Sequence, residues 1–288
     1  MPARRSPAII SRRRFLAASA AAALLPSVAR ASGAPLPIFD AHIHFSHDAA
    51  ERFSAGDAVA ILEKAGLKRA LVSSSGDAGT RALHDAAPDL VLPSLRPYRR
   101  RGEISSWVDD LSVIDFLEDR VKRFKWVAVG EFHLFTAQTG KAVPRRMIEL
   151  ARQHNLLLHA HSDAGAVDGI FAQGPEARVL WAHAGFVGPD VVGPMLGKHA
   201  NLWTDLAFRS EHAHDGRVDD DWRSLFATFP DRVMVGTDTF TPERWHYVVR
   251  HAEWTREWLA DLPPGLAEKI AWRNGEAMIP PHLANLHT

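Results

Sequence analysis

The sequence predicts one α/β domain folded as a TIM (β/α)8 barrel, with a metal site at the C-terminal ends of its strands. Its 288 residues suit a single large domain, because 46% of them are hydrophobic and can form a substantial core. Apolar strand-like runs alternate with helix-like segments, which is the pattern of a parallel sheet closed into a barrel. Histidine and carboxylate residues recur where these runs end, and a barrel carries its chemistry at those ends.

Each strand-like run is short and is followed by a helix-like segment. The candidate strands are 37–44, 68–74, 90–96, 126–133, 155–161, 178–183, 201–206 and 232–238. The candidate helices lie near 56–66, 77–86, 105–122, 144–154, 164–173, 188–197, 219–228, 243–260 and 264–273. An open doubly wound sheet is the alternative, but no glycine-rich dinucleotide motif follows the first strand. The barrel is therefore the better interpretation, with functional loops expected at 135–143 and 207–218.

The first 31 residues differ in composition from the rest of the chain. They contain six arginines and no acidic residue, and their removal leaves 28 basic against 34 acidic residues. A mildly acidic remainder argues against a nucleic-acid or anionic-membrane partner. The alanine-rich run from Phe15 to Leu25 is too short to cross a bilayer as a stable helix, and Ala29 to Ala31 offers small residues for cleavage.

Residues 1–31 are therefore interpreted as a cleaved signal peptide that precedes a barrel spanning residues 35–288, with a C-terminal helical extension. The sequence SRRRFL, from Ser11 to Leu16, resembles the bacterial twin-arginine signal. This resemblance implies that the twin-arginine export machinery is a partner and that the protein is periplasmic or otherwise exported. The chain has no cysteine, so thiolate chemistry and disulfide bonds are excluded.

The heptad FDAHIHF, residues 39–45, alternates without interruption between apolar and ionisable side chains. Successive side chains of a strand point to opposite faces. We therefore expect Asp40, His42 and His44 to face the barrel axis. The apolar residues of the heptad, from Phe39 to Phe45, are expected to pack outward against the helices.

Ionisable residues also occur at the ends of other candidate strands. Together they are His42 and His44, Arg96, Glu131 and His133, His159 and His161, His183, Asp205, and Asp238. A single strand histidine is usually a hydrogen-bonded core residue, but several strands would each need an unrelated reason to bury such a group without compensation. A shared divalent metal is the simpler explanation, and nitrogen and oxygen ligands suit zinc, manganese or iron(II).

The ordered set of strand-end motifs resembles the amidohydrolase superfamily, in the branch that also contains metal-dependent decarboxylases and lactonases. The motifs are D-x-H-x-H at 40–44, GEFH at 130–133, HAHSD at 159–163, WAHAG at 181–185 and GTD at 236–238. Each motif alone is weak, whereas the ordered set is specific. The resemblance implies a barrel, one or two divalent metal ions, most simply zinc, and an activated water molecule.

The resemblance also implies roles for individual residues. His42 and His44 would be metal ligands, and Asp238 would be a ligand that accepts the proton of the activated water. The strand-five ligand stays open between His161 and His159, with His161 favoured because it lies nearer the strand end.

Two further residues are implied to act at the metal centre. His183 would either bind a second metal ion or polarise the substrate carbonyl. Glu131 stands where some relatives place a bridging carboxylate, which keeps a two-metal site open.

Three residues are candidates for substrate binding. Arg96 and Arg209 carry guanidinium groups, which pair bidentately with carboxylate or phosphate. Arg96 could equally be a loop residue in solvent, and Arg209 is the weaker candidate of the two. His133 lies two residues beyond Glu131 and could join the site or merely neighbour it.

These features predict an enzyme, a metal-dependent hydrolase that cleaves an ester, lactone or amide bond of a small molecule. One alternative is a metal-dependent non-oxidative decarboxylase of an aromatic or unsaturated acid. The other is a non-catalytic periplasmic barrel that binds a metal or ligand. Stable membrane insertion is not expected, and the sequence leaves the oligomeric state open.

Overall fold

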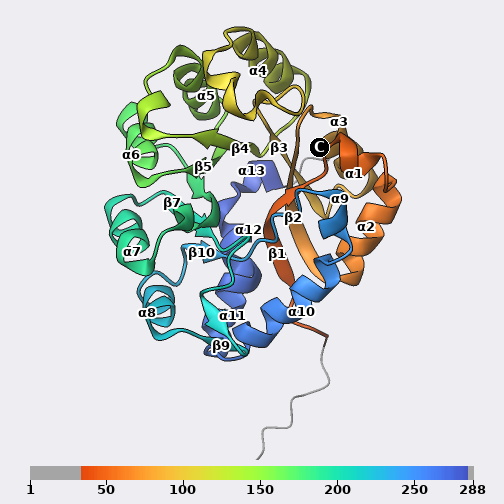
Figure 1. Ribbon diagram of the computed structural model, residues 1–288, viewed down its shortest axis with the longest axis vertical. Coiled ribbons are helices and arrows are strands. Elements are labelled where there is room, and N and C mark those ends of the chain that lie inside the picture. The colour runs from red at the N-terminus through yellow and green to blue at the C-terminus, as the bar shows by residue number, and fades with distance from the viewer. Residues whose placement is uncertain (1–33, 285–288) are drawn as a thin grey trace, which may run out of the picture. The chain divides into compact units, whose positions relative to one another are not determined.

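The computed structural model describes residues 34–284, and Figure 1 shows the course of the chain. The predicted signal peptide at residues 1–31 lies outside the described residues, so export through the twin-arginine machinery stays a prediction. Within the part that is described, no helix has the length and apolar character needed to cross a bilayer.

Eight parallel strands form one sheet in the order β1-β2-β3-β4-β5-β6-β7-β10. They are β1 (Ile38–His44), β2 (Leu67–Ser74), β3 (Val91–Leu95), β4 (Ala128–Leu134), β5 (Leu157–Ser162), β6 (Val179–Trp181), β7 (Leu202–Asp205) and β10 (Val233–Met234). The sheet closes where Ile43 pairs with Thr239 and where the Asp238 N–H donates to the His42 carbonyl at 2.8 Å. The predicted TIM barrel is confirmed, and each predicted strand overlaps an observed one.

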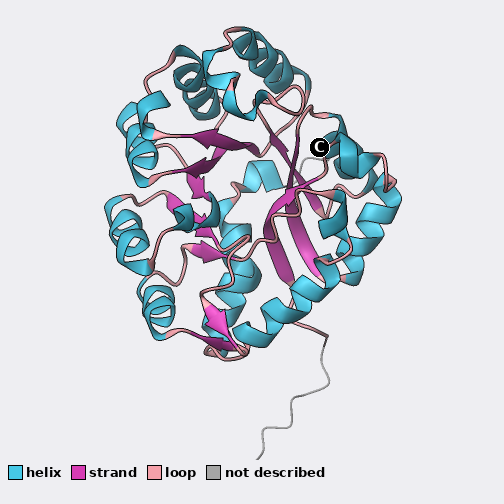
Figure 2. Cartoon of the chain, in the orientation of Figure 1, coloured by secondary structure: helices cyan, strands magenta, loops and turns pink. Residues whose placement is uncertain are grey.

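Helices surround the strands, as Figure 2 shows by colour. Those of the barrel are α1 (His47–Ala50), α2 (Ala55–Lys64), α3 (Ala78–Ala86), α4 (Ser112–Arg123), α5 (Ala142–Gln153), α6 (Ala164–Gln173), α7 (Pro189–Lys198), α8 (Asp220–Thr228), α9 (Pro242–Trp245) and α10 (Val248–Leu259). The chain then continues through α11 (Pro264–Glu268), a π-helical turn (Lys269–Arg273), α12 (Asn274–Met278) and α13 (Pro281–Ala284).

The structure differs from the predicted elements at three places. The helix expected at 243–260 is two helices, α9 and α10, and the one expected at 105–122 begins as two 3₁₀ turns before α4. The loop expected at 207–218 contains a small antiparallel hairpin of β8 (Ala213–His214) and β9 (Arg217–Val218). Asp215 and Gly216 connect its strands with positive φ, as a tight hairpin turn requires.

Strand β1 does not keep the simple alternation that its sequence predicts. Ile43 and Phe45 pack in the main apolar core, as expected, but Phe39 and Ala41 belong to a second cluster that includes Leu157. Leu157 precedes His159 by two residues and so shares its face, which places this cluster inside the barrel beneath the histidines. The expectation that Phe39 and Ala41 face outward is therefore wrong, because the pairing of β1 with β2 shifts register along the strand.

A buried histidine lies outside the barrel axis, among the tryptophans of the last helices. The ring of His212 lies 4.8 Å from that of Trp258 and 5.5 Å from that of Trp254. Neither ring nitrogen of His212 has a hydrogen-bond partner among the described residues. Burial is the main cause that lowers the pKa of His212 to about 4, because the charged imidazolium is poorly solvated there.

We expect His212→Phe to stabilise the fold, and to do so more strongly in acid. Removing an unsatisfied buried imidazole should gain about 1–2 kcal/mol at pH 7. Between pH 6.5 and 4, His212 of the wild type binds a proton in the unfolded state but not in the folded state, so the free energy of unfolding falls as the pH falls. The variant has no such group, and at pH 5 it should avoid a loss of roughly 2 kcal/mol. Urea unfolding at both pH values measures this, with the exposed His154→Phe as the control. An equal effect of His212→Phe at the two pH values would contradict the assignment.

Candidate metal centre

Four side-chain atoms from three strand ends face one another at one end of the barrel. His42 and His44 come from β1, Glu131 from β4, and Asp238 from the segment after β10. His42 Nε2 lies 3.1 Å from His44 Nε2. Glu131 Oε2 lies 3.5 Å from His42 Nε2 and 3.2 Å from His44 Nε2, and Asp238 Oδ1 lies 3.6 and 3.3 Å from the same two atoms.

This spacing fits a divalent metal ion. Ligand atoms about 2.0–2.1 Å from one zinc ion are roughly 2.8–3.0 Å apart when adjacent in octahedral geometry and roughly 3.3–3.4 Å apart in tetrahedral geometry. The donor set contains two imidazoles and two carboxylates, which zinc, manganese and iron(II) all accept. His42, His44 and Asp238 alone already form a group whose ligand atoms lie within 4.8 Å of one another.

The second carboxylate oxygen of Glu131 faces a different pair of histidines. Glu131 Oε1 lies 2.9 Å from His161 Nδ1 and 3.4 Å from His183 Nε2. One carboxylate therefore has each of its oxygens directed at a separate set of imidazole nitrogens. This is the arrangement that a carboxylate bridging two metal ions requires.

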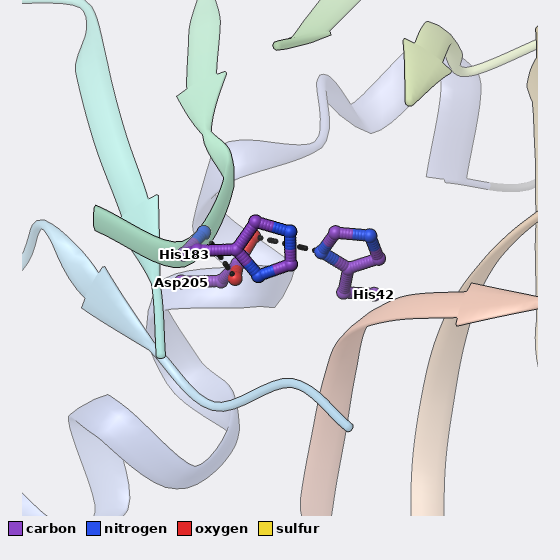
Figure 3. A group of neighbouring side chains, drawn as sticks. All are labelled: His42, His183 and Asp205. Atoms are coloured by element: carbon purple, nitrogen blue, oxygen red, sulfur yellow. Dashed lines mark hydrogen bonds and ion pairs between the residues drawn. The ribbon is translucent and has the colours of Figure 1, made fainter. Parts of the chain in front are cut away.

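Asp205 at the end of β7 holds two of these histidines in place. Figure 3 shows it between His42 and His183, in contact with a ring nitrogen of one and the backbone N–H of the other. Asp205 Oδ2 lies 3.4 Å from His42 Nδ1, and Oδ1 accepts the His183 N–H at 3.0 Å. A carboxylate on the far nitrogen of a histidine fixes the ring and makes its other nitrogen a better ligand.

Side-chain hydrogen bonds also fix the imidazole rings of His44 and His183. His44 Nδ1 lies 2.8 Å from the Ser73 hydroxyl, which leaves Nε2 directed at Glu131 and Asp238. His183 Nδ1 donates to the Ala207 carbonyl at 2.8 Å, so its Nε2 carries the lone pair in the neutral ring. The turn that presents His183 is left-handed throughout, with φ of 57°, 48°, 62° and 54° from His183 to Phe186.

The charges of the cluster depend on one another. Burial works to lower the pKa of His42, but the carboxylates of Glu131, Asp205 and Asp238 raise it well above its usual value. Burial works to raise the pKa of Glu131 and of Asp238, yet the neighbouring histidines hold the pKa of both below the usual range. The carboxylates are thus ionised at neutral pH, as metal binding requires.

The structure separates the two histidines of β5. His161 reaches Glu131 at the mouth of the barrel, whereas His159 lies deeper, with its Nε2 3.2 Å from Asp205 Oδ2. Burial lowers the pKa of His159 to about 4, so it is neutral. His161 thus lies beside Glu131 at the cluster, and His159 contacts Asp205 beneath it.

Arg96 and His133 both line the cavity above the cluster. Arg96 donates through Nε to the Glu131 carbonyl at 2.9 Å and through Nη2 to Glu131 Oε2 at 3.2 Å. Tyr98 accepts the His133 backbone N–H at 2.7 Å, and its own hydroxyl proton can be donated to His133 Nδ1 at 3.1 Å. His133 then carries its proton on Nε2, and burial lowers its pKa to about 3, which makes it a neutral donor.

Arg209 takes part in the loop after β6 rather than in the cavity. Its Nη1 donates to the carbonyls of His183 at 3.0 Å and Val187 at 2.8 Å, and it pairs with Glu211. It does not line the cavity. Nothing in this arrangement supports the predicted substrate contact of Arg209, which instead stabilises the turn that carries His183.

A cavity of about 410 Å³ opens directly above these residues. Its floor is formed by side chains of the cluster, and its rim by the loops after β1, β2, β3, β6, β7 and β10. The floor residues are His44, Glu131, His161, His183 and Asp238. The size suits a small molecule, and a molecule in this cavity would contact the four-atom cluster.

Two residues of the centre had no role in the sequence analysis. Asp205 stands at a strand end, so its position was visible there, but only the fold shows that it touches His42 and His183. Tyr98 lies three residues after β3 in a run of arginines, and no spacing in the sequence connects it to His133.

The comparisons with known proteins agree with this geometry. The amidohydrolase family profile matches residues 39–280. Among curated proteins no significant match is found. The chain belongs to the amidohydrolase family and is an enzyme of the amidohydrolase type.

Solved structures share the fold at low sequence identity. An uncharacterised TIM-barrel protein from Bordetella bronchiseptica is 14% identical with a TM-score of 0.57, covering 86% of this chain and 99% of that one. A candidate 2-pyrone-4,6-dicarboxylic acid hydrolase from Pseudomonas putida is 14% identical with a TM-score of 0.56, covering 88% and 100%. An amidohydrolase from Burkholderia multivorans with bound zinc is 12% identical with a TM-score of 0.55, covering 84% and 99%.

Asp205→Asn tests the support of the two histidines. We expect metal affinity to fall about 10- to 100-fold, because an amide holds the His42 imidazole and the His183 N–H less firmly than a carboxylate does. Competition with a chromogenic chelator measures the affinity. Asp168→Asn on α6 is the control, since Asp168 binds Lys198 and His199 at the surface. Unchanged affinity in Asp205→Asn would refute the supporting role.

Proposed function

We propose that the protein is a metal-dependent hydrolase that opens the ester bond of a small lactone or ester, with amides as a further substrate class. The observation that carries this proposal is the position of Asp238, which lines the cavity with Oδ1 3.3 Å from His44 Nε2. A divalent metal, when bound, lowers the pKa of a water molecule to near 7 and polarises a carbonyl group. The Pseudomonas putida neighbour is named a candidate 2-pyrone-4,6-dicarboxylic acid hydrolase, and a 2-pyrone is a cyclic ester, which supports the same bond type.

The side chains around Asp238 suit the steps of hydrolysis. Asp238 is ionised and can take the proton of the attacking water, then deliver it to the leaving oxygen. His133 faces the cavity as a neutral donor and can hydrogen-bond the oxygen on which negative charge develops. Arg96 is fixed by Glu131 and adds a permanent positive charge at the same wall.

A non-oxidative decarboxylase is the second candidate, because it can use the same ligands. The two oxygens of Glu131, each directed at separate histidines, favour hydrolysis, since a bridged pair of ions is suited to activating water. Release of carbon dioxide from an aromatic or unsaturated acid would favour decarboxylation instead. The non-catalytic binding barrel is set aside by membership of an enzyme family.

Replacing the proton acceptor should separate binding from turnover. We expect Asp238→Asn to lower kcat at least about 10³-fold, because the amide cannot accept a proton at neutral pH. Substrate affinity should change only a few-fold, since an uncharged lactone makes no charge pair with Asp238. Steady-state kinetics on metal-loaded protein give both values, and retention of more than a tenth of the rate would overturn the assigned role.

Metal content tests the bridging role of Glu131. We expect two equivalents of divalent metal in the wild type and about one in Glu131→Gln, because the amide has one oxygen and cannot bridge as an anion. Elemental analysis after dialysis against metal-free buffer measures the content. Glu149→Gln on α5 is a surface control that should keep two. A single equivalent in the wild type would exclude the two-metal arrangement.

A further inference from the structure

Three phenylalanines form one wall of the cavity and are left exposed to solvent. Phe186, Phe208 and Phe240 have 50%, 49% and 45% of their surface accessible, and all three line the cavity. They follow β6, β7 and β10, three neighbouring strands of the barrel. Exposed aromatic side chains gathered at one place mark a binding surface more often than chance exposure.

The three rings form a chain of ring contacts that leads outward from His183 of the metal centre. The Phe186 ring stacks on His183 at 4.5 Å between centroids and an interplanar angle of 18°. Phe208 lies 6.5 Å from Phe186, and Phe240 lies 5.9 Å from Phe208. We name these three residues the aromatic wall.

The backbone holds the aromatic wall in an unfavourable conformation. Phe186 and Phe208 have φ of 54° and 56°, in the left-handed region that bulky side chains rarely occupy. Burial of the two rings cannot be the reason for this backbone conformation, since both rings remain half exposed. Strain at a cavity rim without a packing gain is typical of residues positioned for a ligand.

Arg244 connects the aromatic wall to the proton acceptor. Its guanidinium lies 4.8 Å from the ring centroid of Phe208 and 5.4 Å from that of Phe240. The same group donates through Nε to the Asp238 carbonyl at 2.7 Å and through Nη2 to the Thr237 carbonyl at 2.8 Å. The wall is therefore fixed relative to Asp238.

The side of the cavity formed by the loops after β1, β2 and β3 is mostly polar, with Ile104 as an apolar exception. The loops after β1, β2 and β3 contribute Ser46, Asp48, Ser75 and Arg101 to the lining. Arg101 and Asp48 form an ion pair at 2.8 Å, so their charges largely offset each other. The cavity thus has an aromatic side and a polar side, with the metal centre between them at its floor.

We propose that the aromatic wall binds a planar apolar ring next to the bond that is cleaved, so that the substrates are aryl esters or ring-fused lactones. This inference rests on the proposed function, because it takes the cavity above the metal centre as the substrate site. A planar ring gains stacking or edge contacts with each phenylalanine, whereas a saturated aliphatic chain gains less. The polar side accommodates the oxygen atoms of the ester.

A matched pair of lactones tests the proposal. Dihydrocoumarin and δ-valerolactone contain the same six-membered lactone, and only dihydrocoumarin has a fused benzene ring. We expect KM for dihydrocoumarin to rise about five- to tenfold in Phe208→Ala and in Phe240→Ala, with KM for δ-valerolactone within twofold of the wild type. Phenolate leaves more readily than alkoxide, so the diagnostic is the change between wild type and variant.

Phe135→Ala is the matched control. Phe135 is 47% exposed, like the residues of the aromatic wall, but it follows β4 and does not line the cavity. Its replacement should change neither KM. Phe208→Leu keeps an apolar side chain without an aromatic ring and should lie between wild type and Phe208→Ala for dihydrocoumarin. Circular dichroism verifies that each variant is folded.

Binding measured without turnover separates this inference from the proposed function. In the Asp238→Asn background, calorimetry should show tighter binding of dihydrocoumarin than of δ-valerolactone, and Phe208→Ala should remove most of the difference. If the wild type hydrolyses neither lactone but this binding preference holds, hydrolysis of lactones is refuted and the aromatic wall stands. Equal binding of both lactones, or equal effects of Phe208→Ala and Phe135→Ala, would overturn the aromatic wall.

The same variants also test another use of the wall, as a contact between copies of the chain. Light scattering gives the mass of wild type and Phe208→Ala. A mass that falls in Phe208→Ala, with the lactone preference unchanged, would assign the wall to self-association and overturn the proposal.

Discussion

The metal centre depends on how the barrel closes between its first strand and the segment after its last. Asp40 lies at this seam and is fully buried, and its Oδ1 accepts the N–H of His42 at 3.0 Å and of Thr237 at 3.1 Å. Burial raises its pKa to about 7. By holding the two chain segments together, Asp40 fixes the distance between the β1 histidines and Asp238, although almost two hundred residues separate them. A shift at this seam would pull one side of the ligand set away from the other.

Glu131 lies at the centre of the cluster and connects side chains from several strands. Its carboxylate faces histidines from β1, β5 and β6, and Arg96 contacts it from β3. An ionised carboxylate without such partners would be costly to bury, so these contacts and the carboxylate stabilise one another. The same network explains why Arg96 is fixed at the cavity wall rather than free in solvent. The same interactions thus stabilise the barrel interior and position the groups of the metal centre.

The barrel and most of the candidate ligands could be predicted from sequence, because strand periodicity and strand ends are local signals. His42, His44, Glu131, His161, His183 and Asp238 each stand at such an end, and the fold brings them together as expected. The inward turn of Phe39 could not be predicted, since it follows from a register shift between β1 and β2. The contacts of Asp205 and Arg209 could not be predicted either. Asp205 was noted only as one of the strand-end residues, yet it contacts His42 and His183. Arg209 was offered as a substrate contact, and in the structure it donates to backbone carbonyls. Such roles depend on distances between separate elements, which one sequence does not contain.

The left-handed turn from His183 to Phe186 has a consequence for how this protein can change in evolution. A β-carbon on Gly185 would lie 2.2 Å from the Trp181 ring, so that position accepts only glycine. An insertion or deletion here would displace a histidine of the centre and a ring of the cavity wall at once. New substrate preferences should therefore arise by exchanging side chains in this loop and by altering the lengths of the loops after β7 and β10. The loop after β6 would keep its length while the chemistry around it diversifies.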